Sequence, residues 1–248
     1  MNILTTYSKH IADNLHQVYW RNGAKKQGVL NIRVDAQVDD REIVAELSAL
    51  QWLLGHRSVF GETQVGKGLS LIVSSGAIKK LAKAAEKVRD LRDANLGKPH
   101  LFPYAKFLGH RFAGLEIQVD KDDSWVMPRA QNDVEEIIID KPLLEVLLIP
   151  AIGQVEISDH AIARFAKRLA NAEQQDTWRL LRRVIGGKLR RARLGEDYDQ
   201  AQAAKHGEAG QIWVNDELKW GIVIRSGPIL PVMTTAYAVR KMAVADRV

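Results

Sequence analysis

The sequence predicts an α/β domain with a mixed sheet in its first half, followed by a smaller α+β domain with two helices on an antiparallel sheet. The first prediction rests on three strand-like runs that precede an amphipathic helix, with a short apolar strand after it. The second rests on two helical patterns that precede three further strand-like runs. A chain of 248 residues is long enough to form two domains, each with its own core.

The elements of the first half follow from local patterns. The second strand-like run ends in Asn22-Gly23, a strong hairpin signal. The helix has apolar residues at helical spacing, including Ile43, Leu47 and Leu50, so one of its faces is expected to be buried. The predicted order is strands at residues 2–8, 16–22 and 29–34, a helix at 41–54, a strand at 69–73, a basic helix at 78–92 and a last strand at 101–108.

This order of strands and helices resembles the ribonuclease H fold, and the resemblance covers roughly residues 1–126. In that family a Glu opens the first helix and an Ala-Leu pair follows about two turns later. Here Glu42 opens the helix and Ala49-Leu50 follow. Family members often carry a Gly-His pair with an Asp ten residues beyond the His, and Gly109-His110 and Asp120 have this spacing.

The metal-binding carboxylates of the family are only partly matched. Thr6 stands where the family has an Asp at the end of the first strand, and Ser74 stands where it has one after the fourth. Divalent metals such as Mg²⁺ prefer charged oxygen ligands. The resemblance therefore implies a degenerate metal site, at which Glu42 and Asp120 bind Mg²⁺ weakly or not at all, and no other cofactor is expected.

Several alternatives stay open for these residues. Asp35 and Asp39 lie nearby in the sequence and are candidates to replace the missing carboxylates. Glu42 is equally explained as a solvated first-turn residue, where the helix dipole favours a carboxylate. His110 is also typical of a surface loop, and Asp120 belongs to an acidic segment.

The boundary between the two domains is predicted within residues 127–152, a connecting segment that is rich in Pro and polar residues. Residues 136–140 form a strand that suits either domain. In the second domain, residues 153–248, Ser158 or Asp159 caps a helix that runs to about Leu169. The remaining predicted elements are a helix at 177–185 and strands at 211–215, 219–225 and 230–239.

Two short motifs of the second half, Ile157–Phe165 and Thr234–Tyr237, are similar to those of small toxin-like ribonucleases with the RelE-type or barnase-type fold. Such enzymes need no metal, because a general base and acid drive attack of the 2′-OH on the adjacent phosphate. The resemblance implies a catalytic set of His160 for proton transfer, Arg164, Lys219 and Arg225 for phosphate binding, and Thr235 and Tyr237 for positioning. The alternative is that these are ordinary surface and strand residues.

The clearest charge signal is the segment 178–194, which contains seven Lys or Arg residues and no acidic residue. A run of this density favours a surface that contacts phosphates, although a solvated basic helix is the simpler alternative. The predicted nucleic-acid-binding residues are Arg168, Arg179, Arg182, Arg183, Lys188, Arg190, Arg191 and Arg193.

The whole composition agrees with a polyanionic partner. The formal net charge is +6 and the sequence pI is about 9.5. The absence of Cys excludes disulfides, thiol catalysis and Cys-based zinc sites. Residues 1–17 do not form a signal peptide, so a cytoplasmic location without a membrane partner is expected.

Two functions are consistent with these observations. The first is a nucleic-acid-binding protein with a degenerate ribonuclease H-like domain and a basic C-terminal domain. The second is a metal-independent ribonuclease that acts through the C-terminal domain. RNA or an RNA/DNA hybrid is the expected partner ahead of duplex DNA, and a scaffold for other proteins is a third alternative.

Overall fold

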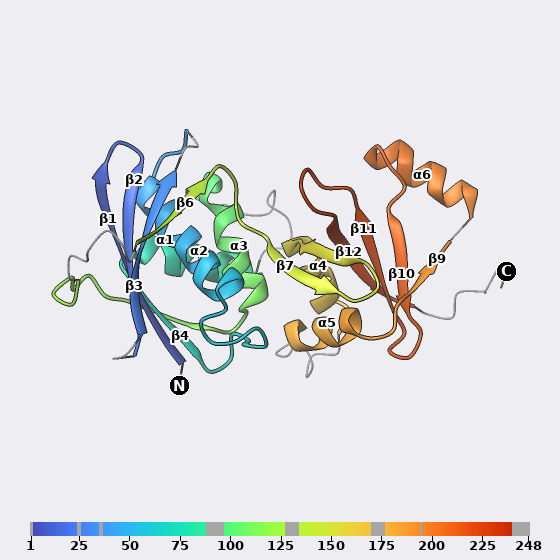
Figure 1. The fold of residues 1–248 in the computed structure, drawn as a ribbon, viewed down its shortest axis with the longest axis horizontal. Coiled ribbons are helices and arrows are strands. Elements are labelled where there is room, and N and C mark those ends of the chain that lie inside the picture. The colour runs from blue at the N-terminus through green and yellow to red at the C-terminus, as the bar shows by residue number, and fades with distance from the viewer. Residues whose placement is uncertain are drawn as a thin grey trace. The chain divides into compact units, whose positions relative to one another are not determined.

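A computed structural model describes residues 2–23, 26–34, 37–87, 97–126, 134–169, 177–193 and 195–239. The chain divides into two compact units, Met1–Leu143 and Leu144–Val248, and each contains a six-stranded mixed sheet (Figure 1). The prediction of a mixed α/β protein is therefore confirmed. Within the described part of the chain, no helix has the length and apolar character needed to cross a membrane.

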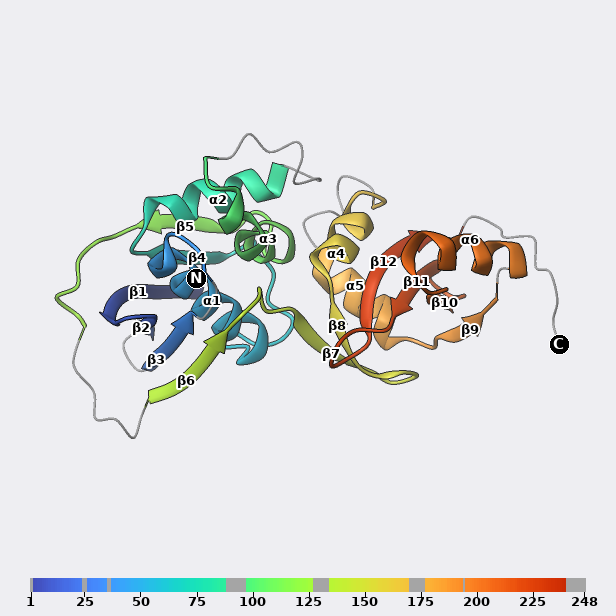
Figure 2. The same ribbon diagram turned by 90° about the horizontal axis from the view of Figure 1, so that it is seen from above.

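The sheet of the first unit has the order β5-β4-β1-β2-β3-β6 (Figure 2). A meander of three antiparallel strands, β1–β3, forms its centre, and the other three strands pair in parallel with β1, β4 and β3. The strands are β1 (Asn2–Ala12), β2 (Leu15–Asn22), β3 (Lys26–Val34), β4 (Leu69–Val73), β5 (Glu116–Val119) and β6 (Val134–Ile139).

The helices of the first unit are α1 (Arg41–Gln51), which continues into the π-helical turn η1 (Trp52–His56), α2 (Gly76–Lys87), the 3₁₀ turn η3 (Pro99–Leu101) and α3 (Phe102–Arg111). Helix α1 packs against β1 and β3 and buries Val44, Leu47 and Leu50 completely. Its apolar stripe therefore meets the sheet as the spacing predicts.

The predicted strand at 101–108 is wrong, because these residues end η3 and begin α3. Their buried side chains include Leu101, Ala105 and Leu108, which repeat at the three- and four-residue steps of a helix. Pro103 lies in the first turn of α3, where its missing N–H has no helical partner to lose. The strand at the sheet edge is instead β5, which lies after this helix.

The second unit has the sheet order β7-β8-β12-β11-β10-β9. The predicted antiparallel sheet is in fact mixed, because β12 pairs with β8 in parallel. Its elements are β7 (Glu145–Ile149), β8 (Gly153–Ile157), α4 (Asp159–Ala166), α5 (Thr177–Gly186), β9 (Arg190–Ala192), α6 (Glu196–His206), β10 (Gln211–Asn215), β11 (Trp220–Arg225) and β12 (Val232–Ala238).

Residues 127–152, which the sequence assigns to the connection, contain two strands of different sheets. Strand β6 completes the first sheet, whereas β7 forms an antiparallel pair with β8 in the second. The boundary between the units accordingly follows Leu143.

Helix α4 begins as predicted. The Ser158 hydroxyl accepts a hydrogen bond from the N–H of Ala161 at 3.1 Å, and it donates one to the carbonyl of Met233 at 2.8 Å. The same side chain thus caps α4 and attaches it to β12. Phe165 then packs against Trp220 of β11, with ring centroids 4.2 Å apart.

Candidate functional site

A buried glutamate, Glu46 of α1, contacts β1 and the end of β4. Its Oε1 accepts hydrogen bonds from Thr6 Oγ1 at 2.7 Å and from the N–H of Ser74 at 2.8 Å. Its Oε2 accepts a hydrogen bond from Ser74 Oγ at 2.5 Å. Two hydroxyl residues, Thr6 and Ser74, therefore meet at this one carboxyl group.

The glutamate at this position is not Glu42, the residue that the sequence predicts for the site. Glu42 lies one turn earlier on α1 and is exposed, whereas Glu46 is 0% exposed. Helical spacing contains a signal for Glu46, because it lies three residues after Ile43 and four before Leu50, on the buried stripe. The position at the helix start favours Glu42 instead.

Burial raises the pKa of Glu46 from 4.5 to about 7. The hydrogen bonds from Ser74 and Thr6 oppose this shift, because they stabilise the charged carboxylate, and the charge of Glu42 adds to it. Desolvation is the larger effect. At neutral pH a substantial fraction of Glu46 is therefore protonated.

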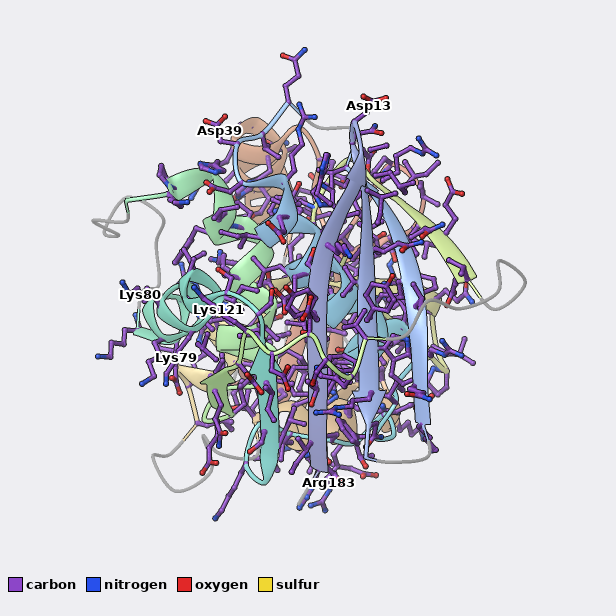
Figure 3. The ribbon with its side chains drawn as sticks, turned by 90° about the vertical axis from the view of Figure 1, so that its left-hand side faces the viewer. Asp13, Asp39, Lys79, Lys80, Lys121 and Arg183 are labelled. Atoms are coloured by element: carbon purple, nitrogen blue, oxygen red, sulfur yellow. The ribbon has the colours of Figure 1, made fainter. Side chains whose placement is uncertain are left out.

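Glu46 borders a pocket of about 360 Å³ at this end of the sheet. Asp40 on its wall is paired with Lys98 and with His100 Nε2, the latter at 3.2 Å, and the bond from Lys98 is the main cause of its lowered pKa. The lining residues are Tyr7, Ser8, Asp40, Glu42, Ile43, Glu46, Ser74, Ser75, Gly76 and Lys121. Lys121 lies on the same side of the first unit as Lys79 and Lys80 of α2 (Figure 3).

The other predicted metal residues lie outside the lining of this pocket. Asp120 pairs its N–H with the carbonyl of Val73, and its carboxylate accepts a hydrogen bond from the N–H of Asp122 at 3.0 Å. Asp39 is exposed, and Asp35 lies outside the described residues. Among the residues that the structure describes, no three His, Asp or Glu side chains are grouped closely enough to hold a metal ion.

The Gly109-His110 pair has a packing explanation. A Cβ atom on Gly109 would lie 2.7 Å from the backbone nitrogen of Glu86, so α2 and α3 approach each other too closely for a larger residue. His110 lies in the last turn of α3. The glycine is therefore required by the contact between these helices, and the pair gives no independent indication of a metal site.

In the second unit, His160, which the sequence predicts for proton transfer, lies on α4. Arg164 Nε donates a hydrogen bond to His160 Nε2 at 3.2 Å, and both belong to α4. Arg168, predicted to bind nucleic acid, donates instead to the carbonyl of Ala236 at 2.6 Å. This bond attaches the end of α4 to β12, which is a structural role.

Three of the other predicted catalytic residues, Thr235, Tyr237 and Arg225, lie on the opposite face of the sheet from α4. Thr235 pairs with Val223 and Tyr237 with Gly221, so their side chains share a face that alternates with the one bearing Trp220. Arg225 belongs to that face also, and it donates to Gln202 of α6 at 2.9 Å and to the carbonyl of Glu208.

Since α4 packs on the Trp220 face, the sheet separates His160 and Arg164 from these three residues. Lys219 lies in the turn before β11, with a left-handed φ of 59°. The predicted catalytic residues are therefore not gathered around one phosphate position.

The basic segment is arranged around a buried stripe. Trp178, Leu181 and Ile185 of α5 are buried. The exposed cations of the segment are Arg179, Arg183, Lys188, Arg190, Arg191 and Arg193, and Arg182 is half-buried. Arg190 is paired with Asp216.

Comparison with protein-family models, curated proteins and solved structures found no match to this chain.

Proposed function

We propose that this chain is a nucleic-acid-binding protein, with a ribonuclease H-like first unit and a basic surface on the second unit that contacts phosphates. The observation that supports this proposal best is the strand order β5-β4-β1-β2-β3, with β1 antiparallel to β2 and parallel to β4. This is the order expected for a ribonuclease H fold, and it brings Thr6, Glu46 and Ser74 together.

The chemistry of these three residues does not fit a pair of divalent metals. Two of the three are neutral hydroxyls, and both donate their hydrogen bonds to the third. Mg²⁺ binding would require an ionised Glu46 that exchanges these bonds for metal coordination, at a position where burial favours its neutral form. Binding to nucleic acid without metal-dependent cleavage is the function that this arrangement favours.

The second unit contains the exposed basic residues that would contact phosphates. Arg183 of α5, Lys188 of the connection that follows and Arg191 of β9 are exposed. Each phosphate that a Lys or Arg neutralises releases counterions, so such a surface binds with an affinity that decreases as salt increases. These side chains would contact the sugar-phosphate backbone of the nucleic acid. Such contacts agree with a protein that selects RNA or an RNA/DNA hybrid by the shape of the duplex.

The test is fluorescence anisotropy with labelled RNA, RNA/DNA hybrid and duplex DNA of one sequence, at several salt concentrations. The variant Arg183→Ala/Lys188→Ala/Arg191→Ala should bind more weakly, and its salt slope should decrease by about three units, roughly one per phosphate contact. A variant with the same loss of charge at the exposed residues Lys141, Lys167 and Lys205 is the control. Equal slopes for the two variants would contradict the proposal.

A further inference from the structure

Ser74 occupies a tight junction between a strand and a helix. Strand β4 ends at Val73 and α2 begins at Gly76, so only two residues make the connection. The Ser74 side chain is half-buried and lines the pocket. The junction thus holds its hydroxyl at the pocket wall while the backbone on both sides is fixed in regular structure.

The carboxyl group beside Ser74 is oriented for proton transfer. Glu46 Oε1 is held by Thr6 Oγ1 and by the Ser74 N–H, at 2.7 and 2.8 Å. This leaves Oε2 directed at Ser74 Oγ, 2.5 Å away. A nucleophile in contact with a base that a third group orients is the usual arrangement for covalent catalysis. Here these three roles fall to Ser74, Glu46 and Thr6.

The same pocket has groups that suit a carbonyl substrate. The start of α2, a helix of 12 residues, lies at its wall through Gly76 and the preceding residue Ser75, and helix N-termini stabilise developing negative charge. Independently, the Ser8 hydroxyl lines the pocket, is 1% exposed and has no hydrogen-bond partner among the described residues. A buried polar atom of this kind ordinarily has a partner, which a bound ligand would supply.

We infer that Ser74 is the nucleophile of an acyl-transfer site in this pocket, with Glu46 as its general base and small carboxylic esters as its substrates. Ser74 Oγ attacks the carbonyl carbon as its proton passes to Glu46 Oε2, and the oxyanion forms beside the first turn of α2. The C–O bond to the alcohol then breaks, and Glu46 returns the proton to the departing alkoxide. Water, activated by Glu46 in the same way, hydrolyses the acyl-serine to the acid and restores the serine.

The pocket favours an uncharged substrate of limited size. Its volume of about 360 Å³ is near the lower end of the range for small-molecule sites, ~300–1,000 Å³. Glu42 on its rim disfavours an anionic acyl group, and the side chains of Ile43 and Tyr7 supply apolar surface. This activity goes beyond nucleic-acid binding and does not depend on it.

The test uses a fluorophosphonate probe, which reacts with activated serines, on the full chain in the absence of nucleic acid. Peptide mass spectrometry should locate the label on Ser74, and Ser74→Ala should lose it. The labelling rate should increase with pH to a plateau, with a midpoint near 7. Glu46→Gln should react at least tenfold more slowly and without this midpoint, because its amide accepts no proton.

Ser70→Ala is the matched control, because Ser70 is a buried serine of β4, the strand that precedes Ser74, and lies outside the pocket. It should be labelled at the wild-type rate, and 4-nitrophenyl acetate hydrolysis should follow the same ranking of variants. An unlabelled Ser74 in the folded wild-type protein would overturn the inference. So would a Glu46→Gln variant that is labelled as fast as the wild type, since Ser74 would then only satisfy the buried carboxyl group.

Discussion

Arg190 and Asp216 form a bidentate ion pair, in which Nε and Nη2 of the arginine donate to the two carboxylate oxygens at 2.5 and 3.1 Å. The pair joins β9 to the turn after β10. It raises the pKa of Arg190 and lowers that of Asp216. Because both side chains are more than half exposed, we expect little stability from the pair. Its main effect is to compensate one charge of the basic segment.

This pairing predicts unequal roles for two adjacent arginines. Arg191→Ala should reduce the salt slope of nucleic-acid binding by about one unit, whereas Arg190→Ala should reduce it less, because its charge is already compensated. Asp216→Asn should strengthen binding, since it leaves Arg190 available for a phosphate. Anisotropy titrations from low to high salt measure all three. Weaker binding by Asp216→Asn would contradict the assignment of Arg190 to this surface.

Replacing Glu46 by Gln should stabilise the protein at neutral and alkaline pH. The pKa of Glu46 is raised from 4.5 to about 7 in the folded state, so the folded state holds the proton more tightly than the unfolded state. The wild type therefore loses stability as pH rises from 4.5 to about 7, by ~3 kcal/mol in total. Glu46→Gln avoids this loss and keeps the shape of the side chain.

Urea unfolding at pH 4, 6 and 8 tests this expectation. The advantage of Glu46→Gln should be near zero at pH 4, intermediate at pH 6 and greatest at pH 8. Glu42→Gln is the control, because Glu42 is an exposed glutamate of the same helix. An advantage that does not change with pH would mean that the burial of Glu46 has no influence on its ionisation.

Introducing two carboxylates beside Glu46 should create a metal site. Thr6→Asp/Ser74→Asp places two further carboxyl groups beside Glu46, at the positions that now hold hydroxyls bonded to it. Titration calorimetry with Mn²⁺ should show at least tenfold tighter binding for this variant than for the wild type, because charged oxygens are the preferred ligands. Two tight ions in the wild type would refute the degenerate-site interpretation.

RNA should remain intact when it is incubated with the protein in EDTA. The sheet of the second unit separates His160 and Arg164 from Thr235, Tyr237 and Arg225, so the predicted catalytic residues do not all face one substrate. A His160→Ala variant should give the same result as the wild type. Cleavage in EDTA that this substitution abolishes would instead support the ribonuclease alternative.

Local patterns in the sequence are sufficient to predict most of the regular structure. Residues 69–73 coincide with β4, and the cap of α4 is Ser158, one of the two predicted residues. Short apolar runs are compatible with either a strand or a helix. Residues 102–108 form a helix, in which apolar side chains at helical spacing pack against α2. Pairing between distant strands, as in β8 and β12, leaves no local signal.

The candidate site was predicted only in part. Thr6 and Ser74 lie close together as the parallel pairing of β1 and β4 predicts, but only Ser74 follows the end of its strand, because β1 continues past Thr6 to Ala12. Glu46 was missed because a buried carboxyl on an apolar stripe contradicts the usual rule for charged residues. Only the contacts with Thr6 and Ser74 explain how it is tolerated there.

The division of residues 134–149 between two sheets determines how the chain can be cut. Strand β6 pairs with β3 over six residues, from Val29↔Val134 to Val34↔Ile139. A fragment that ends at residue 126 would leave β3 as an open edge, with unpaired backbone groups that invite aggregation. A fragment that begins at residue 153 would uncover β8 in the same way. Separate expression of the units therefore requires a cut near Leu143, within the few residues between β6 and β7.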